Sequence, residues 1–303
     1  MNKLQAFLLS VICLLVSGQV AARAYDDVID SGTLIVGVYR DFPPFSYLEN
    51  EQPKGIDVEL GAAIAKQMGL EMQLHWITPD ENLEDDLRNN VWKGHYLDKD
   101  AENPLAMKRV ADVMMRVPYD KEFAHRQDVQ TGEVVNEQVV MFGPYQRESW
   151  RVAFDRQKIE SVSTMAVFQY HPIGVEIDSL PDFYLTSAFQ GRMRKHVKHY
   201  TNARLAFTAM QSGEVDAVMA MRSEIDNLLF SAQNDCFQVA ENGFPSMGKQ
   251  KWDVGMAVKS TYRQLGYAIE EVVDGMVRSG AMSQLVGRYG VTYELPGLYQ
   301  VAQ

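Results

Sequence analysis

A strand–helix–strand pattern near the start of this chain constrains its fold more than any other feature. Residues 33–38 are a short β-branched, apolar run typical of a buried strand. Residues 57–68 carry the apolar face of a helix that Gly69 ends, and the alternation over residues 72–76 indicates a second strand. This spacing predicts a βαβ unit, and therefore a parallel sheet covered by helices.

The second half of the chain repeats the same order. The predicted helix at residues 203–210 leads into an apolar strand at residues 215–221, as a helix and a strand follow each other within residues 83–116. Residues 173–176 also resemble residues 35–38. We therefore expect two similar α/β lobes.

The expected lobes are discontinuous in sequence. We place the first part of lobe 1 at residues 25–146, lobe 2 at residues 147–252, and the return to lobe 1 at residues 253–303, with a strand at 254–258 followed by two helices. Two strands that cross between the lobes form a hinge, and such a hinge lets lobes close on a ligand.

The N-terminus indicates the compartment. Lys3, an apolar stretch over residues 6–16 and the small residues around Arg23 predict a cleavable secretory signal peptide over residues 1–24, and its apolar core is too short to span a bilayer. We expect a periplasmic protein without membrane insertion. Cys236 is then the one remaining cysteine, so no intramolecular disulfide is expected.

Charge limits the partners. The formal net charge is −11, and removal of Lys3 and Arg23 makes it more negative. An acidic chain of this kind is repelled by nucleic acid and by anionic membrane surfaces, so we expect neither as a partner. A basic protein partner remains compatible with it.

Six short motifs in a fixed order extend over almost the whole chain after the signal peptide: Gly37-Val38, Pro43-Pro44-Phe45, Gly55–Leu60, Gly174-Val175, Gly213–Val218 and Gly255–Val258. This set resembles the family 3 extracellular solute-binding proteins, the polar amino-acid binders of ABC importers. The resemblance implies the two-lobed (type II) periplasmic-binding-protein fold, in which each lobe is a mostly parallel sheet flanked by helices and a two-strand hinge joins them. It also implies a monomer that holds a small-molecule ligand without a cofactor and meets the membrane subunits of an importer.

Two positions depart from the family pattern. The family binds the ligand α-carboxylate with an arginine in a Thr-x-x-Arg turn after the strand that matches residues 111–115, and residues 116–123 contain no such turn. The aspartate that binds the ammonium group should fall at Met221, which cannot pair with a cation. We therefore expect a carboxylate-bearing ligand that is not an amino acid.

The Val-Pro that follows Arg116, and the Gly-Pro-Tyr motif at residues 143–145, are similar to a divergent branch encoded beside PQQ-dependent alcohol dehydrogenases. That resemblance implies an accessory role for a periplasmic quinoprotein dehydrogenase. The transport role and the accessory role both stay open at this point.

Six residues are candidates for ligand binding: Phe42, Arg116, Tyr119, Ser179, Met221 and Arg222. Phe42, held between Asp41 and two prolines, either stacks on a ligand or anchors its loop in the core. Arg116 and Arg222 each follow an apolar strand, where side chains enter the cleft of an open α/β sheet, and their planar donors suit a carboxylate. A surface ion pair is the alternative for both arginines.

The remaining candidates have structural alternatives as well. Tyr119 either donates to a ligand or packs, and Met221 takes the place of the family's ammonium partner. Ser179 is expected to offer its hydroxyl to an acidic ligand group, to cap a helix, or both. We expect Asp57 to cap the helix that follows it.

Catalysis and metal binding are not expected. His196 and His199 are spaced for one helix face, but lysines interleave them, so a solvated basic face is expected. The segment from Asp98 to Arg109 begins like a calcium loop and lacks its required sixth and twelfth residues. A cleft carboxylate such as Glu176 or Asp178 leaves a dehydratase-type enzyme as the last-ranked hypothesis.

Overall fold

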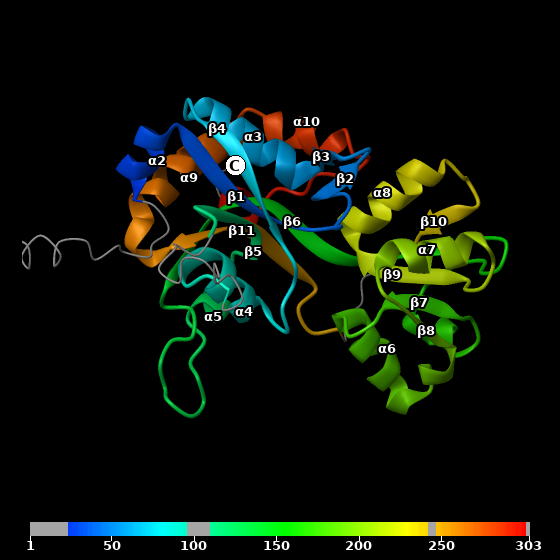
Figure 1. Ribbon diagram of the computed structural model, residues 1–303. Coiled ribbons are helices and arrows are strands. Elements are labelled where there is room, and N and C mark those ends of the chain that lie inside the picture. The colour runs from blue at the N-terminus through cyan, green and yellow to red at the C-terminus, as the bar shows by residue number, and fades with distance from the viewer. Residues whose placement is uncertain (1–23, 96–109, 242–246, 301–303) are drawn as a thin grey trace, which may run out of the picture.

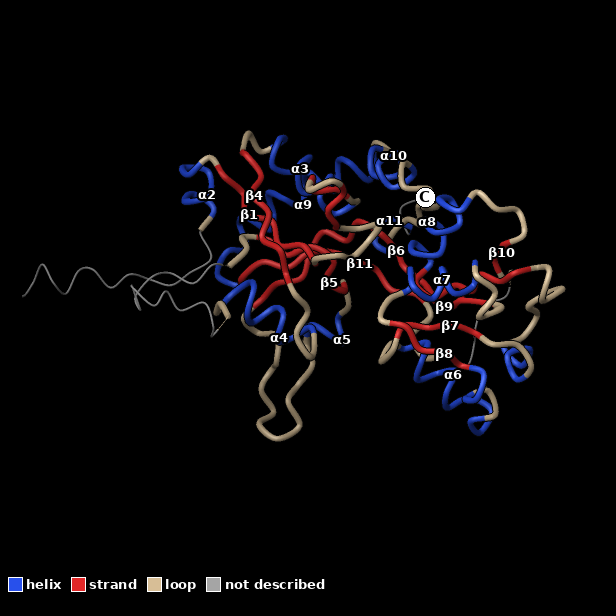
Figure 2. Tube along the Cα trace, turned by 45° about the vertical axis from the view of Figure 1, so that its right-hand side comes forward, coloured by secondary structure: helices blue, strands red, loops and turns tan. Residues whose placement is uncertain are grey.

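The computed structural model describes residues 24–95, 110–241 and 247–300. All but the last residue of the predicted signal peptide, and the calcium-like loop from Asp98 to Arg109, lie outside these ranges. Figure 1 shows two lobes joined by long strands, and Figure 2 shows the sheet of each lobe with helices on both of its faces. Among the described residues, no helix is long and apolar enough to cross a bilayer.

The sheet of lobe 1 has five strands in the order β4-β1-β5-β11-β6. Strand β1 (Thr33–Tyr39) is parallel to β4 (Glu71–Ile77) and to β5 (Val113–Pro118). Strand β11 (Lys251–Lys259) is antiparallel to β5 and to the first part of β6 (Val139–Asp155). The predicted parallel pairs therefore form. Strand β11, which returns to lobe 1, pairs with β6, the strand that leaves it.

Helices cover both faces of this sheet. Helices α3 (Ile56–Gln67), α9 (Arg263–Arg278) and α10 (Ala281–Gly287) bury their apolar residues in one large cluster with β1 and β11. The other face is covered by α4 (Leu83–Leu87) and the π-helical turn η1 (Arg88–Trp92). The smaller elements of lobe 1 are α2 (Tyr25–Ser31), β2 (Tyr47–Glu49), β3 (Gln52–Lys54), α5 (Lys121–Ala124), the 3₁₀ turn η4 (Ser260–Tyr262) and α11 (Gly297–Gln300).

Lobe 2 is built on the second part of β6. That part pairs antiparallel with β9 (Ala217–Met221), and β9 and β8 (Val197–Tyr200) flank β7 (Ile173–Glu176) in parallel. Helix α6 (Leu180–Gly191) packs on one face, and helices α7 (Ala203–Gln211) and α8 (Arg222–Ala232) pack on the other. Strand β10 (Phe237–Val239) and the 3₁₀ turns η2 (Met165–Gln169) and η3 (Arg194–His196) complete the lobe.

The hinge consists of β6 and β11. Strand β6 pairs with β11 from Val139 to Ser149 and with β9 from Trp150 onward, so one continuous strand belongs to both sheets. The lobe boundary that the sequence placed at residue 146 therefore falls inside a strand, and the boundaries stay a prediction.

A third segment, residues 291–300, runs beside the hinge and is called the C-terminal strap here. Within it, Tyr293 donates to the carbonyl oxygen of Tyr145 in β6 at 2.9 Å, and the amide of Thr292 donates to Asp226 of lobe 2 at 3.0 Å. The strap therefore contacts lobe 2 as well as the hinge.

The predicted two-lobed α/β fold is confirmed, and two local predictions are wrong. Asp57 does not cap α3: the N-cap residue is Gly55, which makes no side-chain bond, and both carboxylate oxygens of Asp57 are bound elsewhere. The helix that His196 and His199 were expected to share does not form, because His199 lies in β8, where it pairs with Asp182 at 2.9 Å. The two lysines of this segment are exposed, as expected for a solvated basic face.

Candidate functional site

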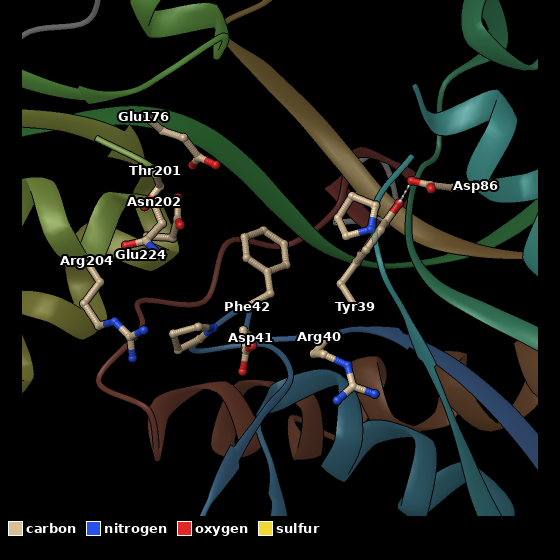
Figure 3. Close-up of a pocket in the computed structure, with 12 residues that line it drawn as sticks. Tyr39, Arg40, Asp41, Phe42, Asp86, Glu176, Thr201, Asn202, Arg204 and Glu224 are labelled. Carbon is tan, nitrogen blue, oxygen red and sulfur yellow. Dashed lines mark hydrogen bonds between the residues drawn. The ribbon is translucent and has the colours of Figure 1, made fainter. Parts of the chain in front are cut away.

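A pocket of about 330 Å³ lies between the two lobes and is called the interlobe pocket here (Figure 3). It opens at the carboxyl ends of β1 and β4 on one side and of β7, β8 and β9 on the other, which is where open α/β sheets bind ligands. The lining residues of lobe 1 are Tyr39, Arg40, Asp41, Phe42, Pro43, Pro79 and Asp86, and those of lobe 2 are Glu176, Thr201, Asn202, Arg204 and Glu224.

Phe42 forms the centre of the lobe 1 wall. Its amide donates to the carbonyl oxygen of Ser46 at 2.8 Å, and the amide of Ser46 donates back at 2.9 Å, so the loop is closed on itself. The Phe42 ring packs edge-on against Phe45, with centroids 4.9 Å apart. The ring is thus anchored on the core and also lines the pocket, so both sequence interpretations describe it, while stacking on a ligand stays a prediction.

Glycine at position 55 is required for this loop. Its φ is 125°, and a Cβ added there would lie 2.1 Å from the carbonyl oxygen of Phe45. The close approach lets the amide of Ile56 reach the carbonyl oxygen of Pro44 at 2.9 Å. The first residues of α3 therefore hold the loop that presents Phe42.

Tyr39 and Asp86 form the second part of the lobe 1 wall. The Tyr39 hydroxyl donates to Asp86 at 2.7 Å, and the amide of Asp80 donates to the other oxygen of the same carboxylate, also at 2.7 Å. Burial raises the pKa of Asp86 against these two bonds. The carboxylate is held by protein donors, so it shapes the wall more than it offers a free charge.

Lobe 2 contributes charged side chains from the starts of two helices. Asn202 caps α7 by accepting from the amide of Leu205 at 2.9 Å, and Arg204 is exposed in the first turn of the same helix. Glu176 ends β7, and Glu224 lies in the first turn of α8. Figure 3 shows Arg204 and the two glutamates on the lobe 2 side, across from Phe42.

The two glutamates give this wall carboxyl groups whose pKa values are raised. Glu224 is 7% exposed and accepts from the amide of Met221 at 3.2 Å. Burial, with a smaller contribution from the negative charge of Glu176, raises the pKa of Glu224 to about 8. Burial also raises the pKa of Glu176. Glu224 is therefore mainly protonated near neutral pH, and a cation bound beside it would favour release of that proton.

Arg116 does not line this pocket. Its side chain is buried in lobe 1, where Nε donates to Asp57 at 2.7 Å and Nη2 donates to the second oxygen of Asp57 at 3.2 Å. Its guanidinium lies 3.3 Å from the centroid of the Phe45 ring. Tyr145 also donates to Asp57, at 2.9 Å. The charge of Arg116 is therefore neutralised inside the protein, and a surface ion pair is wrong for it.

Arg222 does not line the pocket either. It is completely buried, and Nη2 donates to the carbonyl oxygen of Arg147 at 2.7 Å, while Nη1 donates to the carbonyl oxygen of Thr292 in the C-terminal strap. Asp226 lies 3.6 Å from the same guanidinium. The surface ion pair expected as its alternative is wrong, because this side chain joins lobe 2 to the strap from the inside.

The other three candidates do not line the interlobe pocket. Tyr119 is partly exposed after β5, and its amide donates to the carbonyl oxygen of Asp253 at 2.8 Å. Ser179 is the N-cap of α6 and accepts from the amide of Asp182 at 3.3 Å, so the capping prediction is confirmed. Met221 ends β9 and packs against the lobe 1 core. Their binding to a ligand stays a prediction.

Sequence reasoning named Glu176 as a possible cleft carboxylate but missed Arg204 and Glu224. One signal was available for Arg204: it follows the strand at residues 197–200 and opens the next helix, the position that puts a side chain at the carboxyl edge of a parallel sheet. Glu224 gave a weaker signal, three residues after the end of β9. Within the described ranges, no group of three His, Cys, Asp or Glu residues is arranged to hold a metal ion.

Comparison with known proteins supports the resemblance drawn from the motifs. Residues 34–92 match the model of the bacterial extracellular solute-binding proteins, family 3. Over 259 residues the chain is 21% identical to the L-cystine-binding protein TcyJ of Escherichia coli K12, covering 85% of this chain and 82% of that protein. The resemblance to family 3 is thus confirmed.

Solved structures share the fold. An ancestral cationic amino acid solute-binding protein superposes with a TM-score of 0.64 at 17% identity, over 87% of this chain and 98% of that one. An amino acid ABC transporter substrate-binding protein of Streptococcus pneumoniae, bound to L-arginine, gives 0.58 at 18% identity, over 88% and 97%. At these identities the likeness concerns the fold alone. The suggested quinoprotein-associated branch stays a prediction.

Proposed function

We propose that this relative of the family 3 extracellular solute-binding proteins captures a small, polar, carboxylate-bearing solute between its lobes in the periplasm and delivers it to the membrane subunits of an ABC importer. The observation that carries the proposal is the interlobe pocket, which has an aromatic wall on lobe 1 and charged residues on lobe 2. Because its walls belong to different lobes, a solute that contacts both favours the closed arrangement.

Arg204 is the proposed carboxylate anchor, in place of the Arg116 that the sequence suggested. Its guanidinium presents a planar set of donors that matches a carboxylate, and it is exposed at the pocket wall. Arg116 already gives two donors to Asp57. Releasing it to a ligand would leave Asp57 buried without its cation, which is costly.

Amino acids return to the set of candidate solutes. The sequence disfavoured them because Met221 stands where the family has an acidic residue. Glu224, three residues further on, lines the pocket beside Glu176, and its carboxyl can accept a hydrogen bond from an ammonium group and release its proton when that cation binds. The relatives that bind L-cystine and L-arginine support including both in a first panel.

A thermal-shift screen of the mature chain tests the proposal. The panel contains amino acids, L-cystine, dicarboxylates and the carboxamide analogue of each compound that binds. A solute that binds the folded state alone at about one hundred times its dissociation constant adds about 2.7 kcal/mol of stability, which is a clear rise in the midpoint. We expect a rise with carboxylates and little or none with the carboxamides. A panel without any shift contradicts the proposal.

The anchor is tested with a matched pair of variants. Arg204→Ala should weaken binding of the carboxylate by at least tenfold, about 1.4 kcal/mol, and should leave any weak binding of the carboxamide unchanged. Arg192→Ala removes another exposed arginine of lobe 2 that does not line the pocket, and it should bind like the parent. If Arg204→Ala and Arg192→Ala bind the carboxylate with equal affinity, Arg204 is not the carboxylate anchor.

A second candidate function is the accessory role beside a periplasmic dehydrogenase. The ion pair of Arg116 with Asp57 favours it, because this arginine is then not free to bind a ligand carboxylate as the arginine of the family does. Under this alternative the screen gives no shift with any solute, and the chain instead binds a purified quinoprotein dehydrogenase in a sedimentation experiment. Solute binding without such association supports transport.

A further inference from the structure

A second pocket of about 330 Å³ lies beside the hinge and is called the hinge pocket here. Its walls come from β5 and α5 of lobe 1, from α6 of lobe 2, and from the hinge strands. The lining residues are Pro118, Asp120, Phe123, Trp150, Leu180, Lys249 and Trp252. In Figure 1, α5 and α6 lie on the same side of the hinge strands.

Aromatic and aliphatic side chains dominate this pocket. Trp150 of β6 and Trp252 of β11 are both partly exposed, and their ring centroids lie 4.9 Å apart with planes inclined at 46°. The indole nitrogen of Trp150 donates to the carbonyl oxygen of Lys249 at 3.3 Å, so its polar edge is already satisfied. Leu180, at the start of α6, leaves 42% of its surface exposed. Such walls favour an apolar occupant.

The two charged residues of the pocket are bound to each other. Lys249 forms an ion pair with Asp120, and this contact lowers the pKa of the Asp120 carboxyl. Asp120 also accepts from the amide of Phe123 at 2.9 Å. A charged group placed here would compete with an existing pair for its partner, so the occupant that fits is neutral.

One turn separates the hinge pocket from the interlobe pocket. Glu176 lines the interlobe pocket and Leu180 lines the hinge pocket, while Ser179 binds the carbonyl oxygen of Glu176 through its hydroxyl at 2.6 Å and its amide at 3.3 Å. The turn is therefore tight, and its two ends contribute to the two pockets.

We propose that the hinge pocket is a binding subsite for a neutral aromatic ring. Its volume lies at the lower end of the range for small-molecule sites, which suits one or two fused rings. The aromatic walls can contact such a ring edge-on or in an offset stack. Since the walls come from both lobes, a bound ring bridges them. This inference goes beyond the proposed function, because an uncharged ring can fill the hinge pocket whether or not the interlobe pocket holds a solute.

Calorimetric titration of the full mature chain with indole tests the proposal. We expect saturable binding at one site. Trp252→Ala should weaken it at least tenfold, and Leu180→Gln, which alters a partly exposed side chain without disturbing the core, by about fivefold. Phe183→Gln is the matched control, because Phe183 is exposed one turn further along α6 and does not line the pocket. It should bind indole like the parent.

Three outcomes overturn the proposal. The first is the absence of saturable indole binding, and the second is equal affinity in Trp252→Ala, Leu180→Gln and the parent. The third is self-association in sedimentation that Leu180→Gln abolishes and indole does not compete with, which makes the pocket a protein interface. Arg204→Ala should not change indole binding, so a failure here is distinguishable from a failure of the solute-binding proposal.

Discussion

Arg116 shows how a residue with the chemistry of a ligand anchor can belong to the interior instead. Its guanidinium is held by Asp57 and by the face of Phe45. Replacing it with methionine leaves Asp57 buried without a cation, which costs about 3–5 kcal/mol. We therefore expect Arg116→Met to lower the free energy of unfolding in urea by that amount. The double variant Arg116→Met with Asp57→Asn should recover part of the loss, and a single variant as stable as the parent contradicts the ion pair.

Glu224 gives the cleft a pH dependence. Its pKa is raised to about 8 in the folded protein, from an ordinary value near 4.5, chiefly by burial. The folded state therefore holds a proton that the unfolded state has lost, and the stability contributed at low pH disappears as the pH rises through 8. We expect the free energy of unfolding to fall between pH 5 and 9 by a few kcal/mol, on the order of one kcal/mol per pKa unit.

The matched variant for this prediction is Glu224→Gln, which keeps the neutral form at every pH. Its free energy of unfolding should fall less steeply over the same interval, as followed by urea unfolding at each pH. Glu271→Gln, on the exposed face of α9, should retain the slope of the parent. Parallel curves for all three proteins would exclude Glu224 as the source.

At the scale of elements, Gly55 connects α3 to the loop that carries Phe42. Alanine there would place a Cβ 2.1 Å from a backbone oxygen and would require a φ that side chains rarely adopt. We expect Gly55→Ala to destabilise the protein by about 3 kcal/mol or more and to abolish binding of any solute found in the screen. Gly275→Ala, in open space on α9, is the control and should be neutral or slightly stabilising. If Gly55→Ala binds the solute as tightly as the parent does, the loop that carries Phe42 does not contribute to binding.

Elements whose apolar residues repeat with the period of a strand or a helix could be predicted from the sequence. The candidate site could be predicted in part. The strand at residues 33–38 and the helix at residues 203–210 appear close to where their patterns placed them. Phe42 was identified because prolines fix its loop. Arg204 and Glu224 were not: each follows a strand end, which is a usable signal, but which strand ends face lobe 1 depends on the strand order of lobe 2, and local sequence does not encode that order.

The whole molecule is joined by more than its two hinge strands, since the C-terminal strap contacts both lobes. Arg222 holds the strap at the carbonyl oxygen of Thr292, and Asp226 accepts from the amide of Thr292. We expect Arg222→Met to accelerate amide hydrogen exchange over residues 290–296, while α3 keeps its protection. Lys54→Gln, which removes an exposed ion pair with Glu49 between β2 and β3, is the control. Unchanged exchange in the strap would contradict its dependence on Arg222.

The contact between Trp150 and Trp252 gives the protein an optical property of its own. Two indole rings with centroids 4.9 Å apart lie in the two strands that join the lobes, and the chain has only two other tryptophans. Transition dipoles at this separation couple, and the resulting circular dichroism depends on the angle between the rings. Opening and closing should therefore alter the spectrum of the unlabelled protein, which makes the chain a reagentless sensor for whatever it binds.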